Sequence, residues 1–224
     1  GMAAPDTRQE IVDAFADMVR KDSLRKVRVA ALIDKLGVNR NTFYYHFANK
    51  YEVAIYKYRV DLADTLATSD INENDLIFAP INTTASTEVL PYYAHVEIGA
   101  RTLDFSAFYR ALVECVLKDE PFYRKVFAVG EPEFETLFSE LYRPAIEADI
   151  RFILGGRYLP APTFDFMATM LVGHLSSILR YALAHPGDTD NLLDDRVNPF
   201  WNMPYEALTH GFQMHPVNRL RKKK

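Results

Sequence analysis

Residues 37–47 of the chain are Gly-Val-Asn-Arg-Asn-Thr-Phe-Tyr-Tyr-His-Phe. Glycine readily adopts the left-handed backbone conformation that ends a helix, so Gly37 predicts a helix end. Asn39 is a favourable N-cap, which predicts that a new helix begins directly after it. Phe43 and Phe47 then lie one turn apart on this helix and are expected to face the core. The stretch predicts a tight turn followed by a short helix with one apolar side.

Apolar residues recur at helical spacing on both sides of this turn and predict three further helices. The first begins with a capping-box pattern at Thr7, and the second ends at Gly37. The last follows Asn49, which opens another capping-box pattern, and continues to about residue 67. We therefore expect four helices over residues 7–67, the second and third of which form a helix-turn-helix.

The helix after Asn39 carries polar side chains on its surface once Phe43 and Phe47 face inward. Nearly all of them donate hydrogen bonds: Arg40, Asn41, Thr42, Tyr44, Tyr45 and His46. In a helix-turn-helix the second helix enters the major groove, where arginine pairs with guanine and asparagine with adenine. The surface therefore favours DNA binding. For each residue alone, an alternative stays open in which the tyrosines pack against the core and His46 faces solvent.

Three motifs in order, Gly37-Val38, Thr42–Phe47 and Asn49-Lys50, resemble the signature of the TetR family of transcription regulators. The resemblance covers about residues 7–60. Its final part is similar to regulators related to those of dihydroxyacetone kinase operons. It implies that an N-terminal three-helix helix-turn-helix domain binds a double-stranded DNA operator.

The resemblance also implies individual roles, with Arg40 and Asn41 at base edges and Lys50 on a phosphate. The residues expected to contact DNA are Arg28, Asn39, Arg40, Asn41, Thr42, Tyr44, Tyr45, His46 and Lys50. The chain departs from the family just before the second helix, where threonines usually cap the helix and contact DNA but Val27-Arg28-Val29 stands here. A phosphate contact by Arg28 would compensate, and without it DNA affinity would be weakened.

Charge is distributed unevenly along the chain, although the formal net charge is only −4. Residues 1–60 carry a net +4, residues 61–218 a net −13, and residues 219–224 five positive charges. An acidic body is repelled from DNA, so one end of the protein is expected to touch phosphates. The sequence has neither a secretion signal nor a long uncharged apolar run, so we expect a cytoplasmic protein without a membrane span.

Beyond residue 68 the sequence first turns polar and irregular, which predicts a linker that reaches Ser86. Apolar-periodic segments without strand-like alternation follow at about 87–103, 105–118, 120–129, 132–154, 163–185 and 204–212. The predicted fold class is all-α. We expect the DNA-binding domain over residues 1–67 and a helical domain for effector binding and dimerisation over residues 68–224.

Aromatic residues crowd the body and favour a pocket for a small-molecule effector of unknown identity. The candidate effector-binding residues are Tyr92, His95, Phe108, Tyr109, Tyr123, Met167, Met170 and His174. Ordinary core packing is the alternative for most of them. The histidines are scattered, and we find neither a glycine-rich phosphate loop nor a nucleophile with a base. No metal, cofactor or enzymatic activity is expected.

By the same resemblance, the long helices near 132–154 and 163–185 are expected to form a homodimer. Two copies also suit a helix-turn-helix protein, because they match the two half-sites of a palindromic operator. The alternative is that these are simply the longest core helices. The sequence predicts a ligand-responsive repressor; the alternative function is a TetR-like coactivator that acts through a protein partner and binds DNA weakly itself.

Overall fold

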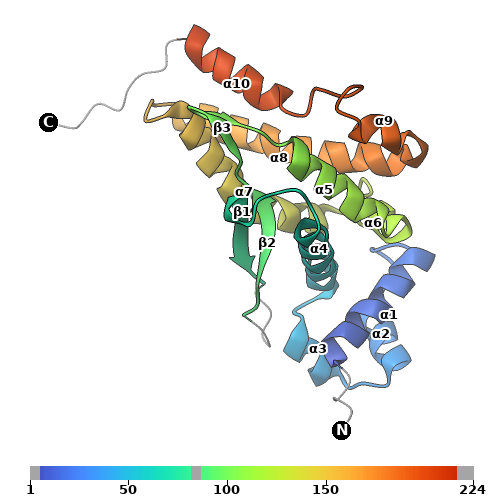
Figure 1. Cartoon of the computed structure of the whole chain (residues 1–224). Coiled ribbons are helices and arrows are strands. Elements are labelled where there is room, and N and C mark those ends of the chain that lie inside the picture. Colours follow the sequence, from blue (N-terminus) through green and yellow to red (C-terminus); the bar gives the residue numbers. More distant parts are fainter. Residues whose placement is uncertain (1–5, 82–86, 216–224) are drawn as a thin grey trace, which may run out of the picture.

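The computed structural model of the chain describes residues 6–81 and 87–215. Helices dominate this part of the chain, and two small antiparallel strand pairs accompany them (Figure 1). The prediction of an all-α fold class is thereby confirmed. The basic end of the chain at residues 219–224 lies outside the described residues.

Three boundaries of the N-terminal helices fall where Gly37, Asn39 and Asn49 predict them. The helices are α1 (Thr7–Lys21), α2 (Val29–Leu36), α3 (Arg40–His46) and α4 (Lys50–Ala67). Gly37 ends α2 in the left-handed conformation with φ +67°. Asn39 caps α3 by accepting a hydrogen bond from the Thr42 backbone N–H at 2.9 Å. The predicted helix-turn-helix is confirmed.

The start of α1 differs from the prediction. Asp6 is the N-cap, and its Oδ1 accepts the backbone N–H groups of Arg8 at 3.1 Å and Gln9 at 3.4 Å. Thr7 is the first helical residue instead. A carboxylate beside the positive end of the helix dipole is a better acceptor than a threonine hydroxyl, which explains why Asp6 takes the cap position.

The two phenylalanines predicted to anchor the helix after Asn39 are buried. Phe43 and Phe47 have no exposed surface, and their ring centroids lie 6.1 Å apart. Phe47 also meets Tyr56 of α4 edge to face at 5.5 Å. Because the two phenylalanines anchor α3 on its inner side, the polar residues between them are directed outward.

The body contains further helices, mostly within a few residues of the predicted bounds. They are α5 (Ser106–Leu117), α6 (Glu120–Val126), α7 (Pro132–Leu154), α8 (Ala161–Ala184), α9 (Thr189–Leu193) and α10 (Met203–Met214), with 3-10 turns at η1 (Glu73–Asp75) and η2 (Pro186–Asp188). The helices α7 and α8 pack side by side, α4 packs directly on α7, and α6 packs on α1 (Figure 1).

The segment 87–103, predicted as a helix, instead forms strands. The strand β1 (Leu76–Pro80) pairs antiparallel with β2 (Val89–Ala94), and β3 (Glu97–Gly99) pairs with β4 (Thr102–Leu103). Pro80 and Pro91 disfavour a helix here because each lacks a backbone N–H. The polar stretch predicted as a linker contains η1 and the first strand.

A buried arginine attaches this strand pair to α4. The side chain of Arg59 is 4% exposed, and its Nη2 donates to the carbonyls of Ala79 at 2.8 Å and Leu90 at 3.1 Å. Its guanidinium also lies over the Tyr92 ring, 5.2 Å from the centroid. A buried charge needs such partners, so Arg59 fixes the position of both strands.

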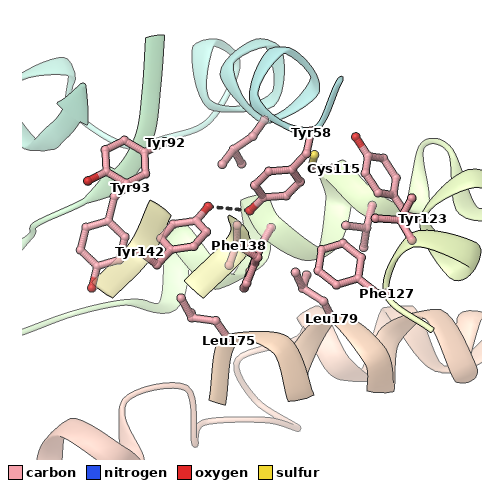
Figure 2. Packing of buried hydrophobic residues seen from close by; sticks show 14 of the residues in the cluster. Tyr58, Tyr92, Tyr93, Cys115, Tyr123, Phe127, Phe138, Tyr142, Leu175 and Leu179 are labelled. Atoms are coloured by element: carbon pink, nitrogen blue, oxygen red, sulfur yellow. Dashed lines mark hydrogen bonds between the residues drawn. The ribbon is translucent and has the colours of Figure 1, made fainter. Parts of the chain in front are cut away.

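The core of the body is built largely from aromatic rings. Tyr58 of α4 and Tyr142 of α7 join their hydroxyls at 2.5 Å, at the centre of the cluster that Figure 2 shows. Phe138 packs against both rings, at 5.6 Å from Tyr58 and 4.9 Å from Tyr142. Since α4 belongs to both the N-terminal helices and this cluster, it connects the two parts of the chain.

A charged cluster makes a second connection between the two parts. Asp119, just before α6, accepts two hydrogen bonds from Arg20 of α1, at 3.0 and 2.6 Å. Lys57 of α4 lies 3.0 Å from the same carboxylate and 2.8 Å from Asp61, which also accepts the Tyr123 hydroxyl at 2.6 Å. Burial alone would raise the pKa of Asp119, but the hydrogen bonds from Arg20 and Lys57 outweigh it and lower that pKa.

We expect Asp119→Asn to lower the free energy of unfolding by about 2 kcal/mol at pH 7, because a charged acceptor for Arg20 and Lys57 is lost. A lowered pKa means that the contribution is complete above the unfolded pKa of about 3.9 and is lost as pH falls through the folded pKa. Urea unfolding of wild type and variant from pH 7 to pH 2.5 measures this. Asp64→Asn, at an exposed position, is the control. An Asp119→Asn effect that persists unchanged at pH 2.5 would contradict the ion-pair assignment.

Candidate nucleic-acid interface

The outer face of α3 presents the predicted DNA-reading side chains to solvent. Arg40 and Asn41 are exposed, and Tyr44 and Tyr45 are 39% and 59% exposed. The Arg40 guanidinium lies over the Tyr44 ring at 5.2 Å, and Tyr44 meets the buried Phe43 edge to face at 5.1 Å. The Arg40 guanidinium therefore rests on the Tyr44 ring, and this contact limits the rotamers of Arg40 before DNA binds.

Two of the predicted contact residues also have a structural task. The Asn39 Oδ1 accepts both the backbone N–H and the hydroxyl of Thr42, at 2.9 and 3.0 Å. Its oxygen is thus committed to capping α3, while Asn39 itself stays exposed. Only the amide NH₂ of Asn39 can then donate to DNA, so any contact that it makes is to an acceptor such as a phosphate oxygen.

His46, at the end of α3, is half-buried and uncharged at neutral pH. Burial and the nearby Arg8 lower the pKa of its imidazole, and its Nδ1 is buried without a hydrogen-bond partner. The ring meets Tyr45 edge to face at 5.1 Å. The lowered pKa favours the neutral imidazole in the free protein, which can hydrogen-bond to DNA and orients Tyr45.

Lys50, at the first position of α4, points into the N-terminal domain. Its Nζ donates to the backbone carbonyls of Arg25 at 2.8 Å and Val27 at 2.9 Å. Burial lowers the pKa of this ammonium. In this geometry Lys50 holds the segment that leads into α2 against α4. It thereby fixes the position of the helix-turn-helix relative to α4.

The start of α2 is a further candidate phosphate contact. Arg28 occupies the N-cap position in place of the family's threonine, is exposed, and makes no side-chain cap hydrogen bond. The first backbone N–H groups of α2 are therefore left without a side-chain acceptor. Such a helix start suits a phosphate, and the Arg28 side chain adds a positive charge beside it. In the sequence, the arginine at position 28, where the family usually has a threonine, is the feature that indicates this phosphate contact.

The candidate effector residues lie in different surroundings in the described part of the chain. Phe108, Tyr109 and Tyr123 are buried, and Tyr123 lies toward the Asp61 end of the core. Met170 is 52% exposed on the outer side of α8. These placements separate the predicted set into core and surface residues.

Other members of that set are bound to neighbouring side chains or border a cleft. Tyr92 packs under Arg59, and Met167 is half-buried on α8. His95 lies 2.8 Å from Asp149 and 2.9 Å from Glu97; burial lowers its pKa, but the hydrogen bonds to the two carboxylates raise it more. His174 lines a cleft between α8 and the segment after α9.

The arrangement of α2, Gly37 and α3, with donors on the outer face, defines a helix-turn-helix DNA-binding domain. Residues 11–56 match a family model described as bacterial regulatory proteins, tetR family. The N-terminal part of the chain therefore belongs to the tetR family, and the protein is a DNA-binding transcription regulator.

Comparison with whole proteins adds little to this assignment. No curated protein matches the chain. Among solved structures, the dihydroxyacetone kinase operon activator DhaS is similar with 14% identity and a TM-score of 0.47, over 95% of this chain and 99% of that one. Within the described residues, no group of three or more His, Cys, Asp or Glu side chains is placed to hold a metal ion.

We expect Arg40→Ala to weaken binding by about 1–3 kcal/mol at one or two operator positions, because a bidentate contact to a base edge is lost. Binding to a panel of single-position operator variants measures the effect. Arg196→Ala, at an exposed position of the body, is the matched control. Equal weakening of all sequences by Arg40→Ala would remove Arg40 from the base-reading set.

Lys50→Met is expected to lower the free energy of unfolding by about 2 kcal/mol, because two backbone carbonyls lose a charged donor. DNA affinity should fall for all sequences alike, since α3 loses its fixed position. Lys35→Met is the control, because the Lys35 side chain is 46% exposed and forms only one ion pair, with Asp17 at 3.7 Å, among the described residues. Weaker DNA binding with unchanged stability would instead indicate that Lys50 acts directly on a phosphate.

Proposed function

We propose that the protein is a ligand-responsive repressor that binds a palindromic operator as a homodimer in the cytoplasm. The observation that carries this proposal is the exposed face of α3, where Arg40, Asn41 and Tyr45 stand free on a domain of the tetR family. Residues 1–67 would form the DNA-binding domain and residues 68–224 the body that binds a small-molecule effector and a second copy.

An exposed apolar stripe on α8 supports dimerisation. Phe166 is 65% exposed and Met170 52%, and the exposed Gly173 follows one turn later on the same face. The helix is long and apolar enough to cross a membrane by length and composition, with 44% of its most apolar window buried. For a DNA-binding protein, such an exposed apolar stripe fits contact with another protein surface.

The neighbouring helix α7 presents small exposed residues beside this stripe. Its exposed Pro144 and Ala148 lie on a small-residue surface that permits close approach. Arg143 of α7 forms an ion pair with Asp165 of α8 and donates to the Thr169 hydroxyl at 3.1 Å. The two helices are thereby fixed relative to each other, as a four-helix dimer interface requires.

The connections between the two parts of the chain support coupling of effector and DNA. Arg20 and Lys57 both contact Asp119, so α1 and α4 follow any displacement of the start of α6. An effector that prefers one arrangement of the body would shift the spacing of the two α3 helices in the dimer. Two half-sites are read together only when that spacing fits, at about 34–36 Å or a multiple of it.

Selection of bound sequences from randomised duplex DNA at two salt concentrations tests the proposed function. A palindrome whose binding weakens steeply with salt would support a sequence-specific regulator, because phosphate contacts release counterions. Absence of any enriched sequence at low salt would overturn it and favour the coactivator, which needs a protein partner. The enriched palindrome would also identify the regulated genes.

We expect Gly173→Arg to abolish the dimer while the monomer stays folded. A Cβ at Gly173 meets nothing within 4 Å, so the single chain accepts a side chain there, whereas a partner helix would not. Gly211→Arg on α10, where a Cβ also meets nothing within 4 Å, is the matched control. Light scattering after size exclusion measures the mass, and operator binding should fall with the dimer. A dimer that survives Gly173→Arg would place the interface elsewhere.

A further inference from the structure

The residues just before α7 contact the loop that leads into the helix-turn-helix. This loop joins α1 to α2 over residues 22–28. The Glu131 Oε1 accepts the backbone N–H of Arg25 at 3.3 Å, and the Arg25 guanidinium donates to the Gly130 carbonyl at 2.8 Å. Both donors belong to Arg25 and both acceptors lie directly before α7, so a displacement of α7 relative to the loop stretches both hydrogen bonds.

The carboxylate of Glu131 is buried at this contact and does not cap its own helix. Glu131 is 7% exposed, and it occupies the N-cap position of α7 without a side-chain cap hydrogen bond. A carboxylate at a helix start commonly accepts the N–H groups of that helix, whereas this one accepts from the α1–α2 loop. Because a buried carboxylate is costly unless it is hydrogen-bonded, the contact favours one position of the loop.

Lys50 holds the same loop from α4. Its Nζ donates to the carbonyls of Arg25 at 2.8 Å and Val27 at 2.9 Å. Burial lowers the pKa of Lys50, and the negative charge of Glu131 opposes part of this effect. The loop is therefore held between the start of α4 and the start of α7. Since α2 begins at Val29, two residues after Val27, its orientation depends on both contacts.

We propose that Glu131 is a positioning residue for DNA binding, through which α7 sets the orientation of the helix-turn-helix. Two copies that meet along α7 and α8 would place both α7 helices in a fixed relation, and Glu131 carries that relation to the loop before α2 in each copy. Asp119 acts elsewhere, because it binds α1 and α4 to the start of α6. The inference rests on the proposed function where it concerns the operator, but the orientation within one chain does not.

Pairs of spin labels test the orientation within one chain. Asp34→Cys on α2 and Glu140→Cys on α7, both at exposed positions, carry the labels, and the fully buried Cys115 stays unlabelled. The labelled chain is mixed with an excess of unlabelled chain, so that the distances measured by double electron-electron resonance belong to single chains. Glu131→Ala should broaden the distance distribution, and Glu131→Gln, which keeps an acceptor oxygen, should retain the narrow one. An equally narrow distribution in Glu131→Ala would overturn the proposal.

Arg25→Ala is the second variant, and it removes the hydrogen bond to Gly130 from an exposed position without a change to the core. It should broaden the distribution as well. The matched controls are Lys26→Ala, which removes a charge from the next residue of the loop, and Glu133→Ala, which removes an exposed carboxylate from the first turn of α7. Both should leave the distribution unchanged, and circular dichroism of all variants verifies the fold. Broadening of equal size in the controls would contradict a role for this particular contact.

Tolerance of half-site spacing is the functional readout. Base pairs are inserted at the centre of the palindrome that the wild type selects, and the affinity for each operator is measured. Glu131→Ala should discriminate about fivefold less between the selected and the lengthened operators, because loosely held reading helices adapt to more spacings. A residue that only stabilises the fold would weaken all operators alike, and that result would overturn the positioning role. If the wild type selects no palindrome, the proposed function fails, and the spin-label distances still decide whether Glu131 sets the orientation.

Discussion

The carboxylate of Asp119 is the charged contact that binds two of the DNA-binding helices to the body at once. It receives Arg20 from α1 and Lys57 from α4, and both helices also pack on the body, α1 on α6 and α4 on α5 and α7. A hydrogen-bonded ion pair has a narrower range of favourable geometries than an apolar contact. The position of α3 relative to the long helices α7 and α8 therefore depends on this carboxylate, and so does the distance at which two copies could present α3 to DNA.

A few contacts also fix the DNA-reading surface, which is the outer face of α3. Phe43 and Phe47 hold α3 from inside, Asn39 holds its start, and Lys50 holds the segment before α2. With those tasks assigned, Arg40, Asn41 and Tyr45 are free of structural duties. Residues with no structural task are those that can be exchanged without loss of the fold, so a change of operator sequence is physically easiest at these positions.

Much of the N-terminal domain could be predicted from sequence because its determinants are local. Gly37, Asn39 and Asn49 act within a few residues of their own position, and the structure confirms the helix ends that they predict. The strands escaped prediction because their stability is non-local: β2 pairs with a stretch that is separated from it in sequence, and both rest on the buried Arg59. Lys50 shows the same limit, since only the folded chain reveals that its ammonium meets the carbonyls of Arg25 and Val27.

The two prolines of the strand pair have a further consequence, for aggregation. A two-stranded sheet leaves backbone edges at which a strand of another molecule can add. Pro80 ends β1 and Pro91 lies within β2, opposite Phe78, so neither position has an N–H to offer to an incoming strand. Phe78 is 46% exposed and Val89 56% exposed beside them, surface that would otherwise favour such addition. The prolines thus disfavour addition of a further strand to this short, partly apolar sheet.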